Sequence, residues 1–299
     1  MSDSIIENLE INGIKLSFSI SKIQENKPII LYLHGGPGDA CIPLTKKFNS
    51  ELEESFIFVN FDQRGAGLSY YSFSKDKKIT IDNILDDIYQ FVIYLLGRFN
   101  QEKLILMGHS WGSALGLLFI QKYPELIYQY IGIGQVVNMK KNIELQKRFL
   151  ENKLGNTNTF DKLDFDNELI SSSLKLNKKV LSNGGSIYGE KNMLKLITPL
   201  FISKYYSMKQ FIRHFKGSYQ SVNSLWSYLL ELNFENVTNF DVPIIFCEGR
   251  YDNHVSSLLV SEYACRITSP VEIIWFEKSG HFPHWEEADK FNEIIKDRF

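Results

Sequence analysis

The sequence of 299 residues lacks any apolar run near the ~20 residues that a helix needs to cross a bilayer. Cysteine is scarce, and Cys41, Cys247 and Cys265 are too widely spaced to form a zinc-binding pattern, so no metal site is predicted. Neither sign of charge is in large excess, since the formal net charge is −2. This balance gives no electrostatic sign of a nucleic-acid or membrane partner.

The first eight residues, MSDSIIEN, contain neither the basic segment nor the apolar core of a signal peptide. In a chain without an export signal, the three thiols are expected to stay reduced. We therefore expect a cytoplasmic protein. The sequence makes no prediction of its oligomeric state.

Strand patterns alternate with helical patterns near both ends of the sequence. Residues 9–20 alternate around Asn12 and Gly13, which is a strong hairpin signal. Helical patterns cover residues 80–99 and 113–123. The later strand patterns are mostly apolar, as is typical of strands covered on both faces, and occupy residues 28–33, 56–61, 104–107, 130–134, 241–250 and 271–276. The sequence thus predicts an α/β fold with a mostly parallel central sheet and helices on both faces.

The alternation stops between residues 135 and 240. This segment is rich in Lys, Asn and Leu and carries several helical patterns, with breaks at Gly155 and at residues 184–185. We predict that it forms a helical lid, or cap, inserted into an α/β domain made of residues 1–134 and 241–299. Most aromatic residues of the insertion are expected to form its own core.

The motif GHSWG at residues 108–112 lies between a predicted strand and a predicted helix. In this context Gly-x-Ser-x-Gly is typical of a nucleophile elbow, a turn so tight that side chains at the flanking positions would clash. Gly108 and Gly112 avoid that clash. Ser110 is the predicted nucleophile, and the alternative is a chance match in a loop.

A serine nucleophile needs a base and an acid that orients it. His281 follows the last predicted strand and Asp252 follows the one before it, so both are expected at the carboxyl edge of the sheet. Ser110, Asp252 and His281 then occur in the Ser…Asp…His order of the α/β-hydrolases. Alternative bases are His109, His214, His254 and His284, and alternative acids are Glu248 and Asp241.

Two backbone N–H groups are needed to stabilise the oxyanion of a tetrahedral intermediate. We assign those of Trp111, just after the nucleophile, and of Gly36 in the motif HGGPG at residues 34–38, with Gly35 as the alternative. Residues 62–67, DQRGAG, match neither common phosphate-binding motif. This loop is predicted to be structural, with Arg64 paired to a buried carboxylate.

Together, the motifs HGGPG, DQRGAGLS and GHSWGS, with GRYD at 249–252 and Gly280-His281, resemble the proline iminopeptidase branch of the α/β-hydrolases. The resemblance covers roughly residues 28–134 and 241–299. It implies an α/β-hydrolase fold and a serine hydrolase without a cofactor that removes an N-terminal residue, often proline, from small peptides.

The resemblance is weaker in the lid, where iminopeptidases hold the substrate's amine with glutamates. Glu190, Glu231 and Glu235 are candidates by position only, and the alternative for each is an exposed helix face. Gly35, Glu231 and Trp226 are the candidate substrate-binding residues. A carboxylesterase, amidase or lactonase acting on small uncharged substrates is the alternative function, and a binding protein without catalytic activity is the third.

Overall fold

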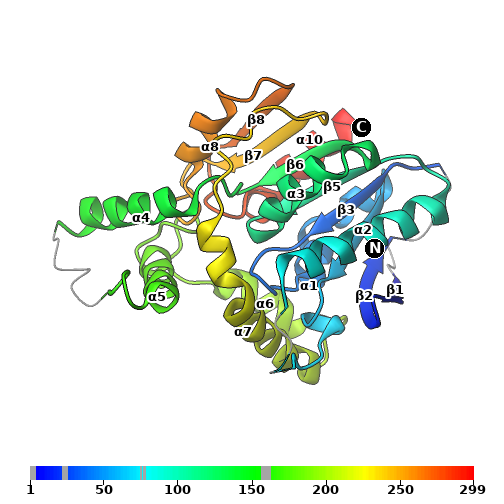
Figure 1. The fold of residues 1–299 in the computed structure, drawn as a ribbon, viewed down its shortest axis with the longest axis horizontal. Helices are drawn as coiled ribbons and strands as arrows, with labels where there is room; N and C mark the ends of the chain where they lie inside the picture. The colour runs from blue at the N-terminus through cyan, green and yellow to red at the C-terminus, as the bar shows by residue number, and fades with distance from the viewer. Residues whose placement is uncertain (1–4, 22–25, 75, 77–78, 156–162) are drawn as a thin grey trace.

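The computed structural model describes residues 5–21, 26–74, 76, 79–155 and 163–299. Its centre is an eight-stranded sheet in the order β1-β2-β4-β3-β5-β6-β7-β8 (Figure 1). The strands are β1 (Ile5–Ile11), β2 (Ile14–Ile20), β3 (Ile29–Leu33), β4 (Ile57–Asp62), β5 (Leu104–His109), β6 (Ile127–Ile133), β7 (Ile244–Gly249) and β8 (Val271–Phe276). All pairs from β4 to β8 are parallel, which confirms the predicted α/β sheet.

The antiparallel part of the sheet is the predicted N-terminal hairpin. β1 and β2 pair with Ile11 opposite Ile14, and β2 then runs antiparallel to β4. Asn12 and Gly13 form the turn with φ values of 53° and 71°. A two-residue hairpin turn of this kind needs positive φ at both positions, which Asn and Gly adopt most readily.

Helices cover both faces of the sheet. They are α1 (Ile42–Phe48), α2 (Ile81–Phe99), α3 (Trp111–Lys122), α8 (Ser257–Ala264), α9 (Pro283–Glu286) and α10 (Ala288–Arg298), with short 3₁₀ helices at Ser50–Glu54, Gly67–Ser69 and Pro124–Leu126. Residues along each central strand alternate between two cores. In β3, Leu31 packs with α2 and α3 while Ile30 packs with α1 and α10. Burial on both faces explains why these strands are continuously apolar.

In the described part of the stretch between β6 and β7, four helices occur: α4 (Met139–Leu154), α5 (Leu169–Ser182), α6 (Leu194–Ile202) and α7 (Met208–Glu231). They gather beyond one end of the sheet, below and to the left of it in Figure 1. α7 approaches the loops of the α/β part closely, since a Cβ on Gly217 would lie 2.7 Å from the carbonyl oxygen of Gly65. Among the described residues, no helix combines the length and apolar character needed to span a membrane.

Candidate active site

Ser110 occupies a sharp turn between β5 and α3, with φ of 54° and ψ of −118°. Positive φ strains a residue with a side chain and persists only where its surroundings enforce it. Here a Cβ on Gly108 would lie 2.3 Å from the carbonyl oxygen of Gly112, and one on Gly112 would lie 2.1 Å from that of Leu33. The amide of Ser110 also donates to the carbonyl of Ile133 at 3.0 Å. The predicted strand–turn–helix context is therefore present.

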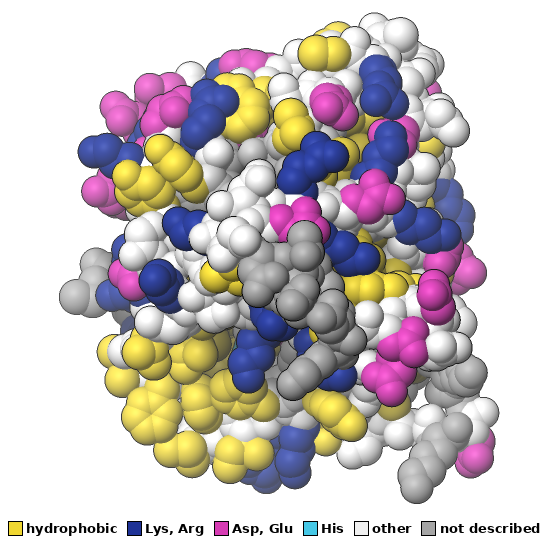
Figure 2. Space-filling model, turned by 90° about the vertical axis from the view of Figure 1, so that its left-hand side faces the viewer, with side chains coloured by type: hydrophobic (Ala, Val, Ile, Leu, Met, Phe, Trp, Pro, Cys, Tyr) yellow, Lys and Arg dark blue, Asp and Glu magenta, His cyan; other side chains and the backbone are white. Residues whose placement is uncertain are grey.

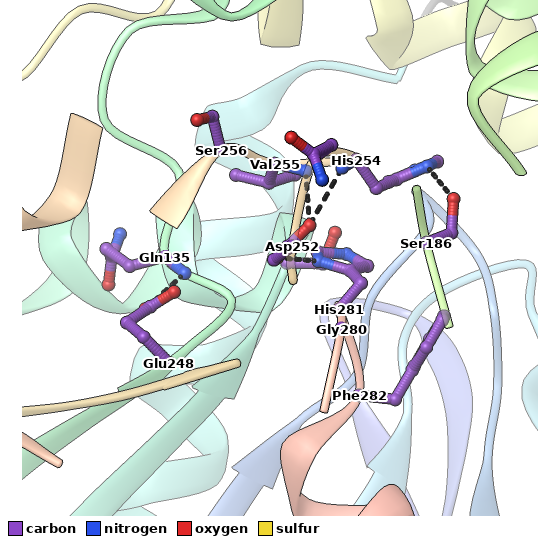
Figure 3. Close-up of polar contacts among 12 residues, drawn as sticks. Gln135, Ser186, Glu248, Asp252, His254, Val255, Ser256, Gly280, His281 and Phe282 are labelled. Atoms are coloured by element: carbon purple, nitrogen blue, oxygen red, sulfur yellow. Dashed lines mark hydrogen bonds and ion pairs between the residues drawn. The ribbon is translucent and has the colours of Figure 1, made fainter. Parts of the chain in front are cut away.

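Asp252 and His281 follow the neighbouring strands β7 and β8, and their side chains meet. The distance from Nδ1 of His281 to Oδ2 of Asp252 is 2.7 Å. Oδ1 of Asp252 accepts the amides of His254 and Val255 at 2.8 and 2.9 Å (Figure 3). The His281 amide donates to the carbonyl of Ser186 at 2.7 Å. With Nδ1 directed at the carboxylate, the imidazole is oriented so that Nε2 is left to accept a proton.

Nε2 of His281 is buried and has no hydrogen-bond partner among the residues that the structure describes. His281 and Ser110 border the same cavity, although no hydrogen bond joins them within the described chain. Burial lowers the pKa of His281, so its imidazole is neutral at neutral pH. A neutral, buried nitrogen without a partner is a group that can act as a general base.

The two alternative acids are placed less suitably than Asp252. Glu248 lies within β7, where its Oε1 accepts the amide of Gln135 at 2.9 Å (Figure 3). Asp241 is exposed and precedes β7, at the opposite end of that strand. Burial raises the pKa of Asp252, while the His254 side chain and the amides of Val255 and His254 oppose the rise.

Three of the alternative histidines have other partners, whereas Nδ1 of His214, at the border of the cavity, is buried without a hydrogen-bond partner among the described residues. Nε2 of His284 lies 2.9 Å from the Tyr32 hydroxyl, and Nε2 of His109 lies 2.9 Å from the His281 carbonyl oxygen. His254 borders the cavity, and the centroid of its ring lies 4.8 Å from that of the His281 ring. His254, an alternative base in the sequence, thus lies against the imidazole of His281.

The HGGPG loop follows β3 and passes beside the elbow. A Cβ on Gly35 would lie 3.3 Å from the Cβ of Ser110, and both Gly35 and Gly36 border the cavity. Gly36 has φ of +114°, which a residue with a side chain rarely adopts. Trp111 is the first residue of α3, and amides of a first helical turn have no acceptor inside the helix. The two predicted oxyanion donors thus flank Ser110, and their role remains a prediction.

Gln63 connects the two segments that carry these amides. Its Nε2 donates to the carbonyl of His34 at 3.0 Å, and its Oε1 accepts Nε1–H of Trp111 at 3.0 Å. The next residue, Arg64, donates two hydrogen bonds of 2.6 Å to the carboxylate of Asp87. This confirms the structural loop and the pairing of Arg64 that the sequence predicts.

The cavity beside Ser110 has a volume of about 380 Å³. Much of its wall is apolar and comes from the segment between β6 and β7, chiefly from Leu181, Met193, Leu196, Ile197, Leu200 and Phe215. Among the described residues, Asp39 is the one acid on this lining and Lys178 the one Lys or Arg. The cavity can therefore hold an apolar group next to the nucleophile, with one charge of each sign at its border.

Neither Glu231 nor Trp226, the other two predicted substrate-binding residues, borders this cavity. Glu231 is exposed at the end of α7 and pairs with Lys140, and the indole of Trp226 is buried and donates to Ser173 Oγ at 2.8 Å. Gly35 does border the cavity, as predicted. Sequence reasoning missed Asp39, whose one signal is its position directly after the HGGPG loop.

Residues 28–288 match the family described as the alpha/beta hydrolase fold. The chain belongs to this family. Its expected fold is confirmed, as is its resemblance to the proline iminopeptidase branch, and the chain is a hydrolase.

Curated relatives cover nearly the whole chain. "Probable aminopeptidase YbaC" of Bacillus subtilis is 30% identical, over 98% of this chain and 96% of its own length. A proline iminopeptidase of Saccharolobus solfataricus is 22% identical, over 95% of this chain and 89% of its own length. Among solved structures, the proline iminopeptidase-related protein of Thermus thermophilus superposes with a TM-score of 0.67 at 19% identity, over 98% and 96%. VinJ superposes with a TM-score of 0.72 at 17% identity, over 99% of this chain and 98% of VinJ.

Proposed function

We propose that this chain is a serine hydrolase that works through an acyl-enzyme and acts as an aminopeptidase on small peptides or aminoacyl amides. Ser110 attacks the carbonyl carbon, His281 takes its proton and returns it to the leaving amine, and Asp252 stabilises the imidazolium. The amides of Trp111 and Gly36 bind the oxyanion. The observation that carries the proposal is the 2.7 Å contact from Nδ1 of His281 to Asp252, which leaves Nε2 unpaired at the cavity of Ser110.

The aminopeptidase assignment needs an anionic group for the substrate's ammonium, because a buried charge without a partner is costly. Asp39 is the acid on the cavity lining, and its Oδ1 accepts the hydroxyl of Ser218 at 2.9 Å. The names of the relatives, an aminopeptidase and a proline iminopeptidase, support the same assignment. Asp39 thus takes the place that the sequence assigned to lid glutamates.

The test is hydrolysis of prolyl and other aminoacyl arylamides by the purified protein. Ser110→Ala should lower kcat by roughly a millionfold, as expected when a triad nucleophile is removed. Ser182→Ala, which alters an exposed serine at the end of α5, should leave kcat unchanged. Labelling of Ser110 by a fluorophosphonate should be lost in the first variant alone. Failure of the wild type to react with the probe would favour the binding protein without catalytic activity.

A carboxylesterase, amidase or lactonase is the second candidate, favoured by the apolar wall that α6 and α7 give the cavity. An uncharged substrate needs no ammonium partner, so Asp39→Asn should leave its hydrolysis intact. For an aminopeptidase, the same variant should raise KM for free aminoacyl arylamides by roughly tenfold to a hundredfold, as expected when a charge-assisted contact is lost. Equal turnover of N-acetylated and free substrates by the wild type would decide for the second candidate.

A further inference from the structure

The outward sides of α6 and α7 carry an apolar surface, which we name the lid face. Six of its large side chains are between 47% and 73% exposed: Phe201, Ile202, Met208, Ile212, Phe215 and Tyr219. The last four follow one another on α7 at intervals of four, three and four residues, so they share one side of that helix. Phe211 contacts Phe201 and Phe215 edge to face, with ring centroids 5.4 and 5.0 Å apart, and so joins the two helices. Contiguous exposed apolar surface of this kind marks an interaction site.

The charge of the same segment is strongly one-sided. Residues 191–230 contain six Lys or Arg and no Asp or Glu, whereas the whole chain has a net charge of −2. Lys195, Lys209 and Lys216 are exposed beside the apolar side chains. Figure 2 shows hydrophobic side chains gathered in the lower part of the molecule, the level at which α6 and α7 lie in Figure 1, with Lys and Arg next to them. The net charge of the whole chain is near zero and therefore gives no sign of this basic, apolar region.

We propose that the lid face binds an anionic lipid surface. Helices with apolar side chains flanked by lysines lie in the interface of a bilayer, where the apolar groups enter the acyl boundary and the ammonium groups contact lipid phosphates. Nucleic acid fits this surface less well, because its backbone offers no apolar layer to receive Ile202, Met208 and Ile212. These three apolar side chains therefore favour an anionic lipid surface over nucleic acid as the partner.

The lid face adjoins the cavity beside Ser110. Phe215 is 47% exposed and also borders the cavity, and on α6 Leu196 and Leu200 line the cavity while Phe201 and Ile202 face outward. The same two helices thus separate the cavity from the surface that meets the lipid. Binding to lipid does not depend on which substrate the cavity accepts.

The test is co-sedimentation of the full chain with phosphatidylcholine vesicles, with and without phosphatidylglycerol. The wild type should bind the vesicles that contain phosphatidylglycerol, and added salt should weaken binding by screening. Replacing Lys195, Lys209 and Lys216 by Gln should reduce affinity roughly a hundredfold, given the contribution of each basic residue near an anionic surface. Ile202→Ser combined with Ile212→Ser should reduce it at least about tenfold through lost apolar burial.

Matched controls lie on other parts of the surface. Leu258→Ser on α8 removes an apolar side chain that is 51% exposed, and Lys103→Gln removes an exposed ammonium group. Both controls should bind vesicles as the wild type does, and all variants should keep the circular dichroism of the wild type. The proposal is overturned if the wild type does not bind phosphatidylglycerol vesicles, or if the lid-face variants bind them as well as the controls. Self-association through Ile202 and Ile212 in the absence of vesicle binding would identify the face as a contact between copies.

Discussion

The hydroxyl of Tyr206 donates a hydrogen bond of 3.0 Å to Oδ2 of Asp62. Tyr206 lies between α6 and α7, and Asp62 ends β4, so this bond connects the lid to the sheet. Both residues are buried, and the same carboxylate oxygen accepts the amide of Leu68 at 2.7 Å. Because α6 and α7 form much of the apolar wall of the cavity, we expect the position of that wall to depend on this contact.

Tyr206→Phe should therefore affect both stability and substrate binding. Loss of a buried hydrogen bond to a carboxylate lowers the free energy of unfolding by about 1–3 kcal/mol. We expect a rise in KM larger than the fall in kcat, since the lid wall contacts substrate without touching the reacting atoms. Urea unfolding and steady-state kinetics measure the two effects. Tyr205→Phe, one residue earlier, is the control, and equal changes in the two variants would contradict the role of the contact.

Asp62 should also make stability depend on pH. Burial raises its pKa to about 7, with the Leu68 amide and the Tyr206 hydroxyl opposing the rise. The folded state thus binds a proton more tightly than the unfolded state, whose Asp has a pKa of about 3.9. Its contribution to stability is complete below that value and is lost as pH rises through about 7.

Asp62→Asn should flatten the decline in unfolding free energy between pH 4 and 7, by up to about 1.4 kcal/mol per pH unit. Urea unfolding across this range measures the slope. Asp241→Asn, which changes an exposed carboxyl, should keep the slope of the wild type. A slope in Asp62→Asn as steep as in the wild type would mean that this carboxyl does not hold the proton.

Gly112→Ala should destabilise the fold by about 3 kcal/mol, the upper end of the usual cost of overpacking, because the new methyl group meets rigid backbone. Its Cβ would lie 2.1 Å from the carbonyl oxygen of Leu33 and 2.8 Å from that of His34. Gly97 lies within α2 with nothing within 4 Å of its added Cβ, so Gly97→Ala should stabilise the protein by up to about 1 kcal/mol. Denaturant midpoints measure both. Coinciding midpoints for Gly112→Ala and the wild type would rule out the close approach at the elbow.

Local signals made much of this arrangement predictable from the sequence. Asp252 and His281 each follow a predicted parallel strand, and carboxyl ends of such strands share one edge, so their 2.7 Å contact follows from topology. The elbow and the hairpin at residues 12–13 depend on glycines within a few residues of the turn they allow. These features depend on short stretches of chain and on the order of the strands.

The placement of the helices between β6 and β7 could not be predicted in this way, because it depends on packing between distant segments. Glu231 and Trp226 occur on one helix, yet one is exposed and the other buried against α5. The apolar periodicity of α7 does not say whether a row of apolar side chains faces the core or the solvent. In the structure, Met208, Ile212 and Tyr219 are exposed to solvent. Sequence periodicity gives the sides of a helix but does not say which neighbour covers each side.

Gln63 should act as a positioning residue for the oxyanion donors, since it connects His34 to the indole of Trp111 by two hydrogen bonds of 3.0 Å. Gln63→Leu leaves a buried carbonyl and a buried indole N–H without these partners. We expect kcat to fall roughly tenfold to a hundredfold with little change in KM, less than the loss of a whole oxyanion donor. The rate of fluorophosphonate labelling of Ser110 should fall in parallel, because the probe also develops charge at that site.

Gln121→Leu is the matched control for this prediction. Gln121 lies on α3, ten residues after Trp111, and its exposed side chain donates to the carbonyl of Leu117. Its substitution should leave kcat and the labelling rate unchanged. A rise in KM with normal kcat in Gln63→Leu would show that the residue supports substrate binding, because a shifted oxyanion donor weakens the transition state more than the ground state.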